Sequence, residues 1–231
     1  MTVVTISRQL GSHGDTVAQL LCERLGYRYF DKNLMLGLAV QAGVAPYEVV
    51  DLSDEKHRAR SLIERLFGNY AAPMSDPSTW AVSAEMAAQE RMSAAQIRHL
   101  ILAAHAQGNV VIVGRGGQVV LHDMPGTLHV RVMAPLEVRV RRQQERTGMT
   151  AAAARAQLLE RDRATADFVR QYFGAGVGDP ELYDLIVNTG KLTALDAVDL
   201  IVSALGVVDR EADAQPPPTV ASSAAGPGAE R

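Results

Sequence analysis

The feature that most constrains the fold lies near the amino terminus, where a short apolar strand runs into a glycine-containing loop and then a helix. Residues 2–6 are almost wholly apolar and β-branched, as in parallel strands that are covered on both faces. Val17, Leu21 and Leu25 then recur at helical spacing, and the pattern ends at Gly26. In this arrangement backbone N–H groups and the helix dipole converge on an anion. The segment therefore predicts a phosphate-binding loop.

Strand and helix patterns alternate along the rest of the chain. The further strand patterns are residues 27–30, 110–113, 128–133 and 184–187, and the further helical patterns begin at Asp31 and cover about 135–147, 150–172 and 194–205. Such alternation predicts a parallel sheet with helices on both faces. We therefore expect an α/β fold of the P-loop NTPase type.

The predicted domain organisation is a single domain over residues 1–207. Within it, residues 45–107 are mostly helical in pattern and predict a helical insertion, which is interrupted by a proline-containing loop near 69–79. Residues 208–231 are rich in Pro, Ala, Ser and Gly and predict a disordered tail. A short proline-rich docking motif is the alternative interpretation of this tail.

Composition and charge exclude several classes of protein. The chain has 231 residues, of which 47% are hydrophobic, so it can bury a substantial core. Its net charge of −3 gives no global electrostatic reason to bind nucleic acid or an anionic membrane. One cysteine cannot form an internal disulfide, no secretory leader pattern opens the chain, and the histidines lack metal-ligand spacing. We expect a cytoplasmic protein without a resident metal site.

The loop departs from the standard phosphate-binding motif, G-x-x-x-x-G-K-[ST]. Aligned through the start of the helix, the chain has Arg8 at the first glycine, His13 at the second and Gly14 at the lysine. We expect Arg8 to extend over the turn from the end of the strand and to take over part of the lysine's work. The Asp15 carboxylate at the helix start would instead repel a phosphate. The candidate residues for binding phosphate and ATP are Ser7, Arg8, Gly11, Ser12, His13, Gly14, Asp15 and Thr16.

Four landmarks give the chain a family resemblance. In order, they are I-S-R-Q-x-G-S-x-G before a helix, L-G-Y-R-Y-F-D, V-I-V-G-R-G and D-P-E-x-Y-D-L-I-V-N-T. Together they resemble the cytidylate kinase-like family over about residues 1–207. The resemblance implies a P-loop nucleoside monophosphate kinase architecture, with ATP and Mg²⁺ as ligands and CMP as the first acceptor to test. Where such kinases carry glycine-lysine-serine-threonine and glycine-arginine-aspartate, this chain has His13-Gly14-Asp15-Thr16 and Gly114-Arg115-Gly116.

Positive charge is concentrated in residues 131–170, which contain nine arginines and five acidic residues. The resemblance places a lid at about 135–175, and the lid is therefore arginine-rich. Phosphoryl transfer needs cations around the moving phosphoryl group, and the arginine fork suits phosphate. The candidate catalytic residues are Arg8, Arg139, Arg161 and Arg163. The alternative interpretation of the lid arginines is a solvated helix face with pairs at i,i+4.

The candidate acceptor site comprises Asp31, Gly114 and Arg115. Each follows a predicted strand at the carboxyl edge of the sheet, where ligands bind in open α/β folds. Glycines on both sides of Arg115 allow the backbone to approach a ligand. Asp31 resembles an acceptor-site acid of the kinases, although it fits a simple helix N-cap equally well.

These observations favour an ATP-dependent phosphotransferase that acts on a nucleoside monophosphate (CMP-like) or another small acceptor. A kinase-derived regulatory module that binds nucleotide or phosphate and has lost turnover is the alternative, because the lysine is missing. A structural dimer with residues 45–107 as its interface is a third hypothesis. The expected partners are ATP and a small phosphate acceptor, without nucleic acid or membrane, and an oligomer is compatible with the sequence.

Overall fold

A five-stranded parallel sheet forms the centre of the structure, a computed structural model that describes residues 2–32, 34–35 and 94–214. The strand order is β2-β3-β1-β4-β5. The phosphate-binding loop follows the central strand, so its mouth lies at the carboxyl edge of the sheet. The strands are β1 (Val3–Arg8), β2 (Arg28–Phe30), β3 (Val110–Val113), β4 (Thr127–Met133) and β5 (Leu185–Asn188).

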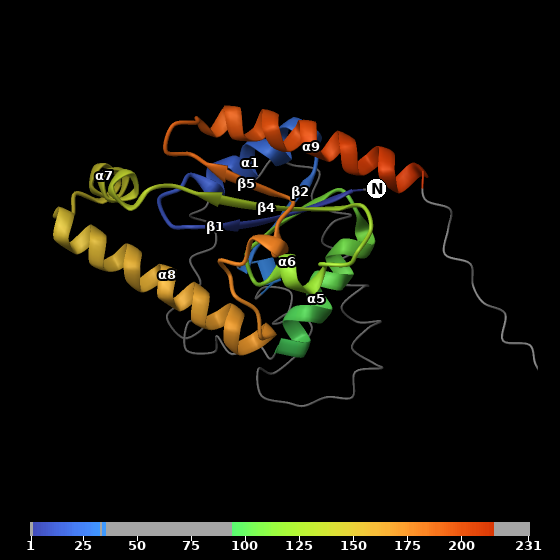
Figure 1. The fold of residues 1–231 in the computed structure, drawn as a ribbon, viewed down its shortest axis with the longest axis horizontal. Coiled ribbons are helices and arrows are strands. Elements are labelled where there is room, and N and C mark those ends of the chain that lie inside the picture. The colour runs from blue at the N-terminus through green and yellow to red at the C-terminus, as the bar shows by residue number, and fades with distance from the viewer. Residues whose placement is uncertain (1, 33, 36–93, 215–231) are drawn as a thin grey trace, which may run out of the picture.

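Helices cover both faces of this sheet (Figure 1). Helices α1 and α9 pack on one face, α5 and α6 lie on the other, and α7 and α8 form a pair beyond the end of β4. The helices are α1 (Gly14–Leu25), α5 (Ala94–Gln107), α6 (Gly117–Val120), α7 (Leu136–Thr147), α8 (Ala151–Phe173) and α9 (Ala194–Ala214), with a 3-10 turn, η2, at Pro180–Leu182.

The alternation of side chains along the strands produces two separate cores. Val4 and Ile6 of β1 point to the α1 and α9 face, where they join a cluster that includes Leu21 and Ile201. Val3 points to the opposite face and packs in a cluster with α5. Because successive strand residues face opposite sides, a strand buried on both faces is mostly apolar, and the buried polar residues of β1, Thr5 and Ser7, are hydrogen-bonded.

The predicted fold class is confirmed, and each predicted strand lies within two residues of an observed one. Helix α9 is longer than expected and continues through Ala214, so residues 208–214 are helical and not part of the predicted tail. These residues contain no proline, and the described helix reaches Ala214; the next residue, Gln215, precedes Pro216, a sequence position that disfavours helical geometry. The expected insertion is outside the described residues up to position 93, and so are residues 215–231. In the described part of the chain no helix is long and apolar enough to span a membrane.

Candidate functional site

The loop between β1 and α1 has the backbone geometry of an anion-binding turn. Gly11 and His13 both adopt left-handed φ angles, of 79° and 61°. A side chain at Gly11 would also press against the Cβ and backbone of Arg139. Among the described residues, the N–H groups of Gly11, His13, Gly14 and Asp15 find no hydrogen-bond acceptor. Orphan donors of this kind at a helix start bind anions.

The opposite side of the loop is held by donors from other elements. The Leu10 carbonyl accepts from Arg139 at 3.4 Å and the Gly11 carbonyl from Arg142 at 3.1 Å. The Ser12 carbonyl accepts from the hydroxyl of Thr189 at 2.7 Å. Three consecutive carbonyls are therefore fixed toward the protein. Since N–H and C=O point in opposite directions across a peptide bond, this arrangement turns the N–H groups of Gly11 and His13 away from the protein, whereas the Ser12 N–H donates to the Gln9 carbonyl at 3.2 Å.

Two of the candidate loop side chains have structural partners. The Ser12 hydroxyl is fully buried and donates to the carbonyls of Gln9 and Val132, at 2.7 and 3.1 Å. Ser7 accepts hydrogen bonds from Arg131 at 3.1 Å and from the Tyr183 hydroxyl at 3.2 Å. Both serines thus tie the loop to the sheet. His13 is mostly exposed, and burial of part of its ring together with the Arg142 charge lowers its pKa, so the imidazole is mainly neutral at pH 7.

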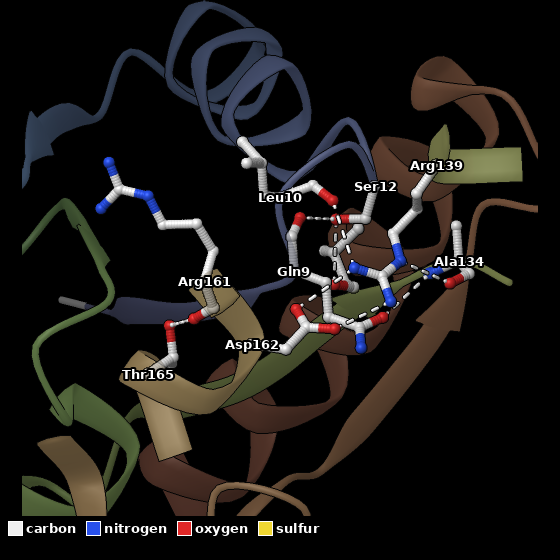
Figure 2. A network of polar contacts seen from close by, with 9 residues as sticks. Gln9, Leu10, Ser12, Ala134, Arg139, Arg161, Asp162 and Thr165 are labelled. Atoms are coloured by element: carbon white, nitrogen blue, oxygen red, sulfur yellow. Dashed lines mark hydrogen bonds and ion pairs between the residues drawn. The ribbon is translucent and has the colours of Figure 1, made fainter. Parts of the chain in front are cut away.

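Arg139 lies beneath the loop and is almost fully buried (Figure 2). Its Nε donates to the Ala134 carbonyl at 3.0 Å, and Nη1 and Nη2 bind the two oxygens of Asp162 at 3.2 and 2.9 Å. The guanidinium therefore joins α7, α8 and the loop. Its predicted contact with a transferred phosphoryl group stays a prediction, since all three nitrogens bind protein acceptors in the structure.

The two other lid candidates lie on different sides of α8. Arg161 and Arg163 are both exposed and are two residues apart, which is about 200° around a helix. Figure 2 shows the Arg161 side chain pointing away from Asp162. Arg161 is close enough to Lys32 to contribute to the lowering of the Lys32 pKa, whose larger causes are burial and the Arg115 charge. The structure brings Arg161, and not Arg163, to the ends of the strands.

Arg8 lies at the end of β1 and faces the start of α1. Its Nε donates to Oδ1 of Asp15 at 2.9 Å. Its Nη1 lies so close to Gly114 that a side chain there would overlap it. Arg8 therefore extends from the phosphate-binding loop to the turn after β3, which carries the candidate acceptor residues.

The turn after β3 presents Arg115 at this edge. Gly114, Arg115 and Gly116 all have positive φ, at 76°, 55° and 76°. The Arg115 guanidinium lies over the ring of Phe168, 5.1 Å from its centroid, and a Cβ at Gly116 would overlap Phe173. Burial lowers the pKa of Arg115, with a smaller contribution from Arg8 in the same direction, while Tyr172 and Asp31 act to raise it.

Asp31 and Lys32 complete the edge at the end of β2. The Asp31 carboxylate accepts from the Leu34 backbone N–H at 3.1 Å, which is an N-cap contact. The N-cap interpretation is therefore confirmed, and the acceptor role stays a prediction. Lys32 is partly buried and lies near Arg115 and Arg161.

Sequence reasoning missed the residues that hold the loop from outside. Arg142 donates to the Thr189 carbonyl at 2.7 Å as well as to Gly11, and Thr189 is buried. Arg131 and Tyr183 do the same for the sheet side through Ser7. The sequence signals were the place of Arg131 and Arg142 in the arginine-rich residues 131–170 and the place of Tyr183 and Thr189 in the D-P-E-x-Y-D-L-I-V-N-T landmark.

Oxygen ligands for Mg²⁺ are present at the loop in a form that fits a nucleotide-borne ion. Mg²⁺ binds through one or two carboxylates, several waters and substrate phosphates. The Asp15 carboxylate and the Thr16 hydroxyl are exposed at the start of α1. No group of three or more His, Cys, Asp or Glu side chains in the described ranges could hold a metal alone. These residues fit an ion that arrives with ATP.

Comparison with a family model assigns this fold to a specific family. The model of the cytidylate kinase-like family matches residues 3–191, which include the loop, the β3 turn and the α7–α8 pair. The chain belongs to the cytidylate kinase-like family. The family predicted from the four landmarks is thereby confirmed, and with it a kinase-like fold.

Individual relatives of this cytidylate kinase-like chain differ in how much they share. The cytidylate kinase of Halobacterium salinarum is 25% identical over 217 residues, which are 94% of this chain and 95% of the relative. The cytidylate kinase of Sulfolobus acidocaldarius is 31% identical over 106 residues, 46% of this chain and 56% of the relative. The uronate isomerase of Corynebacterium glutamicum is 36% identical over 122 residues, 53% of this chain but 23% of the relative. The chain thus covers less than two thirds of two of these relatives.

Among solved structures, an uncharacterized protein from Eubacterium ventriosum has a TM-score of 0.60 to this chain. The match covers 89% of this chain and 98% of that protein, at 21% sequence identity. At this level of identity the similarity supports the fold alone.

Proposed function

We propose that this chain is an ATP-dependent phosphotransferase whose acceptor is a nucleoside monophosphate, with CMP as the first candidate. The family supports a nucleotide or small-molecule kinase, and the acceptor is our inference from two cytidylate kinase relatives. ATP is the donor and Mg²⁺ its counter-ion in this proposal.

The observation that carries the proposal is the meeting of four cations at the carboxyl edge of the sheet. Arg8, Lys32, Arg115 and Arg161 come from the ends of β1, β2 and β3 and from α8. Their proximity is evident because Arg8 and Arg161 act on the pKa values of Arg115 and Lys32, respectively. Within the described part of the chain, the Asp15 carboxylate pairs with Arg8 and the Asp31 carboxylate acts on Arg115.

Arg8 and Arg115 bring like charges close together at this edge, and a bound anion would relieve their repulsion. Functional sites retain such repulsion between like charges because the charges stabilise a bound phosphate or a developing negative charge. Arg8 links these cations to the loop, where the N–H groups of Gly11, His13, Gly14 and Asp15 have no acceptor among the described residues. A site that binds two phosphate-bearing ligands side by side needs this distribution, with donors for one ligand and arginines between the two.

A coupled assay of ADP release tests the proposal. Purified protein is incubated with Mg-ATP and, separately, CMP, UMP, AMP, GMP and a hexuronate, the last because one relative is named a uronate isomerase. We expect CMP to raise ADP release to a rate of about 1–100 per second. The proposal is wrong if none of the four nucleoside monophosphates raises ADP release above the rate with ATP alone, and also if only the hexuronate does.

The second candidate function is a regulatory module that binds nucleotide without turnover. Gly14 and Asp15 favour it, because they replace the lysine and the hydroxyl residue of the standard motif. Calorimetric binding of ATP together with no acceptor-dependent ADP release would support this candidate over the enzyme.

A further inference from the structure

Position 14 requires a glycine for a steric reason and not because of its backbone conformation. It lies in the first turn of α1 with an ordinary φ angle, so its conformation suits any residue. A Cβ built at Gly14, however, would overlap Cβ and Cγ of Arg8. The aliphatic stem of Arg8 thus occupies the space that a side chain at position 14 would need. A lysine at position 14 is incompatible with Arg8 in its observed place.

The head of Arg8 is oriented by a single contact and keeps donors in reserve. Nε binds Asp15 at 2.9 Å, whereas within the described ranges neither Nη nitrogen donates a hydrogen bond. About a third of the side chain is exposed. The fork lies between the start of α1 and the turn at Gly114, with two nitrogens available for the bidentate geometry that suits phosphate.

Asp15 takes a definite role in this arrangement. A carboxylate at the start of α1 would by itself repel a phosphate bound at the loop. The pairing with Arg8 neutralises that charge and holds the guanidinium beside the helix start. Arg8, Gly14 and Asp15 therefore depend on one another. Gly14 leaves room for the stem of Arg8, and Asp15 orients the guanidinium of Arg8.

We propose that the glycine and the cation of the standard phosphate-binding motif have changed places in this chain. Arg8 supplies the cation at the position of the first glycine, and Gly14 stands at the position of the lysine. The cation reaches the outer phosphates of ATP from the end of the strand instead of from the start of the helix, and Asp15 orients it. The inference deepens the proposed function and rests on it, because it assigns the donor side of the same site.

Direct titration of Mg-ATP by calorimetry tests the exchange with four variants. We expect Arg8→Ala to weaken ATP binding about tenfold or more, because charge-assisted hydrogen bonds are lost. Gly14→Lys should also weaken it, since the new side chain displaces Arg8. The double variant Arg8→Gly/Gly14→Lys restores the standard pair and should bind ATP more tightly than either Arg8→Ala or Gly14→Lys. Arg8→Lys keeps the stem and the charge but loses the fork, and should lie between wild type and Arg8→Ala.

Arg24→Ala is the matched control. It removes one arginine from α1, at the opposite end of the helix, where Arg24 forms an exposed pair with Asp199 at 3.4 Å. Its ATP affinity should equal that of the wild type. Circular dichroism melting of every variant separates a folding defect from a binding defect, and Arg8→Lys carries the test if Arg8→Ala fails to fold.

The possible outcomes separate this inference from the proposed function. The inference is overturned if Arg8→Ala binds ATP within twofold of wild type, or if the double variant binds no better than the two single ones. Acceptor turnover together with either result leaves the proposed function standing. If wild type binds ATP and the variants behave as expected but no acceptor is phosphorylated, the exchange stands and the proposed function falls. Failure of the wild-type protein to bind ATP would overturn both.

Discussion

Arg139 of α7 binds both carboxylate oxygens of Asp162 of α8, and the same guanidinium reaches the Leu10 carbonyl of the phosphate-binding loop. One buried side chain therefore links the packing of α7 against α8 to the conformation of the phosphate-binding loop. The apolar contacts beside it, between Leu10, Val140 and Leu158, reinforce the connection. The helix pair is fastened to the loop at this point.

Replacing Arg139 by alanine should destabilise the protein, because the carboxylate of Asp162 and two carbonyls lose their donor. We expect the free energy of unfolding to fall by about 3 kcal/mol, as for removal of one partner of a buried pair. Urea denaturation measures this loss. The double variant Arg139→Leu/Asp162→Leu should lose less than the sum of the single variants, because no unpaired charge remains. A loss below about 1 kcal/mol for Arg139→Ala would contradict a structural role.

Replacing Thr189 by valine should loosen the phosphate-binding loop at nearly constant side-chain volume. The variant leaves the Ser12 carbonyl without its donor and removes an acceptor from Arg142. An unsatisfied buried group costs about 1–3 kcal/mol, so we expect a fall of that size in unfolding free energy and a severalfold weaker ATP affinity. Thr165→Val is the control, since the Thr165 hydroxyl binds only the Arg161 carbonyl of the preceding turn on an exposed face (Figure 2). Equal effects of the two variants on ATP affinity would refute the role given to Thr189.

The regular elements were predictable because their signals are local. The β3 run of four buried residues and the helical spacing up to Gly26 determine the strand and the helix without reference to the rest of the chain. Helix α9 was predicted over residues 194–205 only, because the change in composition after it was interpreted as the start of a disordered tail. The helix continues to the last residue before the proline-restricted segment.

The candidate site was predictable in place but not in pairing. Strand ends locate Arg8 and Arg115 at one edge, because parallel strands end on the same side of a sheet. The sequence could not show that Arg139 is taken up by Asp162, or that Arg142 reaches Thr189 across 47 positions. Both contacts depend on how α7 docks against the loop, which no periodicity encodes.

Arg161 should contribute to catalysis more than the other arginines of α8, because it is the α8 arginine whose charge acts on the pKa of Lys32. We expect Arg161→Ala to lower kcat/KM for the acceptor about tenfold, as for loss of a charge-assisted contact. Arg155→Ala is the control, because Arg155 lies on the same helix and pairs with the exposed Glu137. The acceptor assay with both variants decides the matter. A similar kcat/KM for the two variants would make Arg161 an ordinary solvated side chain.

The stability of the protein should decrease as the pH falls from 7.5 to 5.5, and His129 should account for much of the decrease. The buried ring is held in one neutral form, in which Nε2 donates to the Leu121 carbonyl at 3.2 Å and Nδ1 accepts from the Thr5 hydroxyl at 2.8 Å. Burial lowers the pKa of His129 below its ordinary value of 6.5, and this effect outweighs the opposing influence of Asp184. The unfolded chain therefore binds a proton that the folded state does not accept in this range. The stability contributed by the neutral ring is fully present above pH 6.5 and is lost as the pH falls toward the folded-state pKa.

Melting midpoints at pH 7.5, 6.5 and 5.5 measure the effect of His129. His129→Gln can still donate and accept, and we expect it to have a lower midpoint at pH 7.5 but a smaller decrease toward pH 5.5. A remaining decrease would come from His13 and His105, whose pKa values burial also lowers. An unchanged pH dependence in His129→Gln would show that protonation of this ring does not control stability.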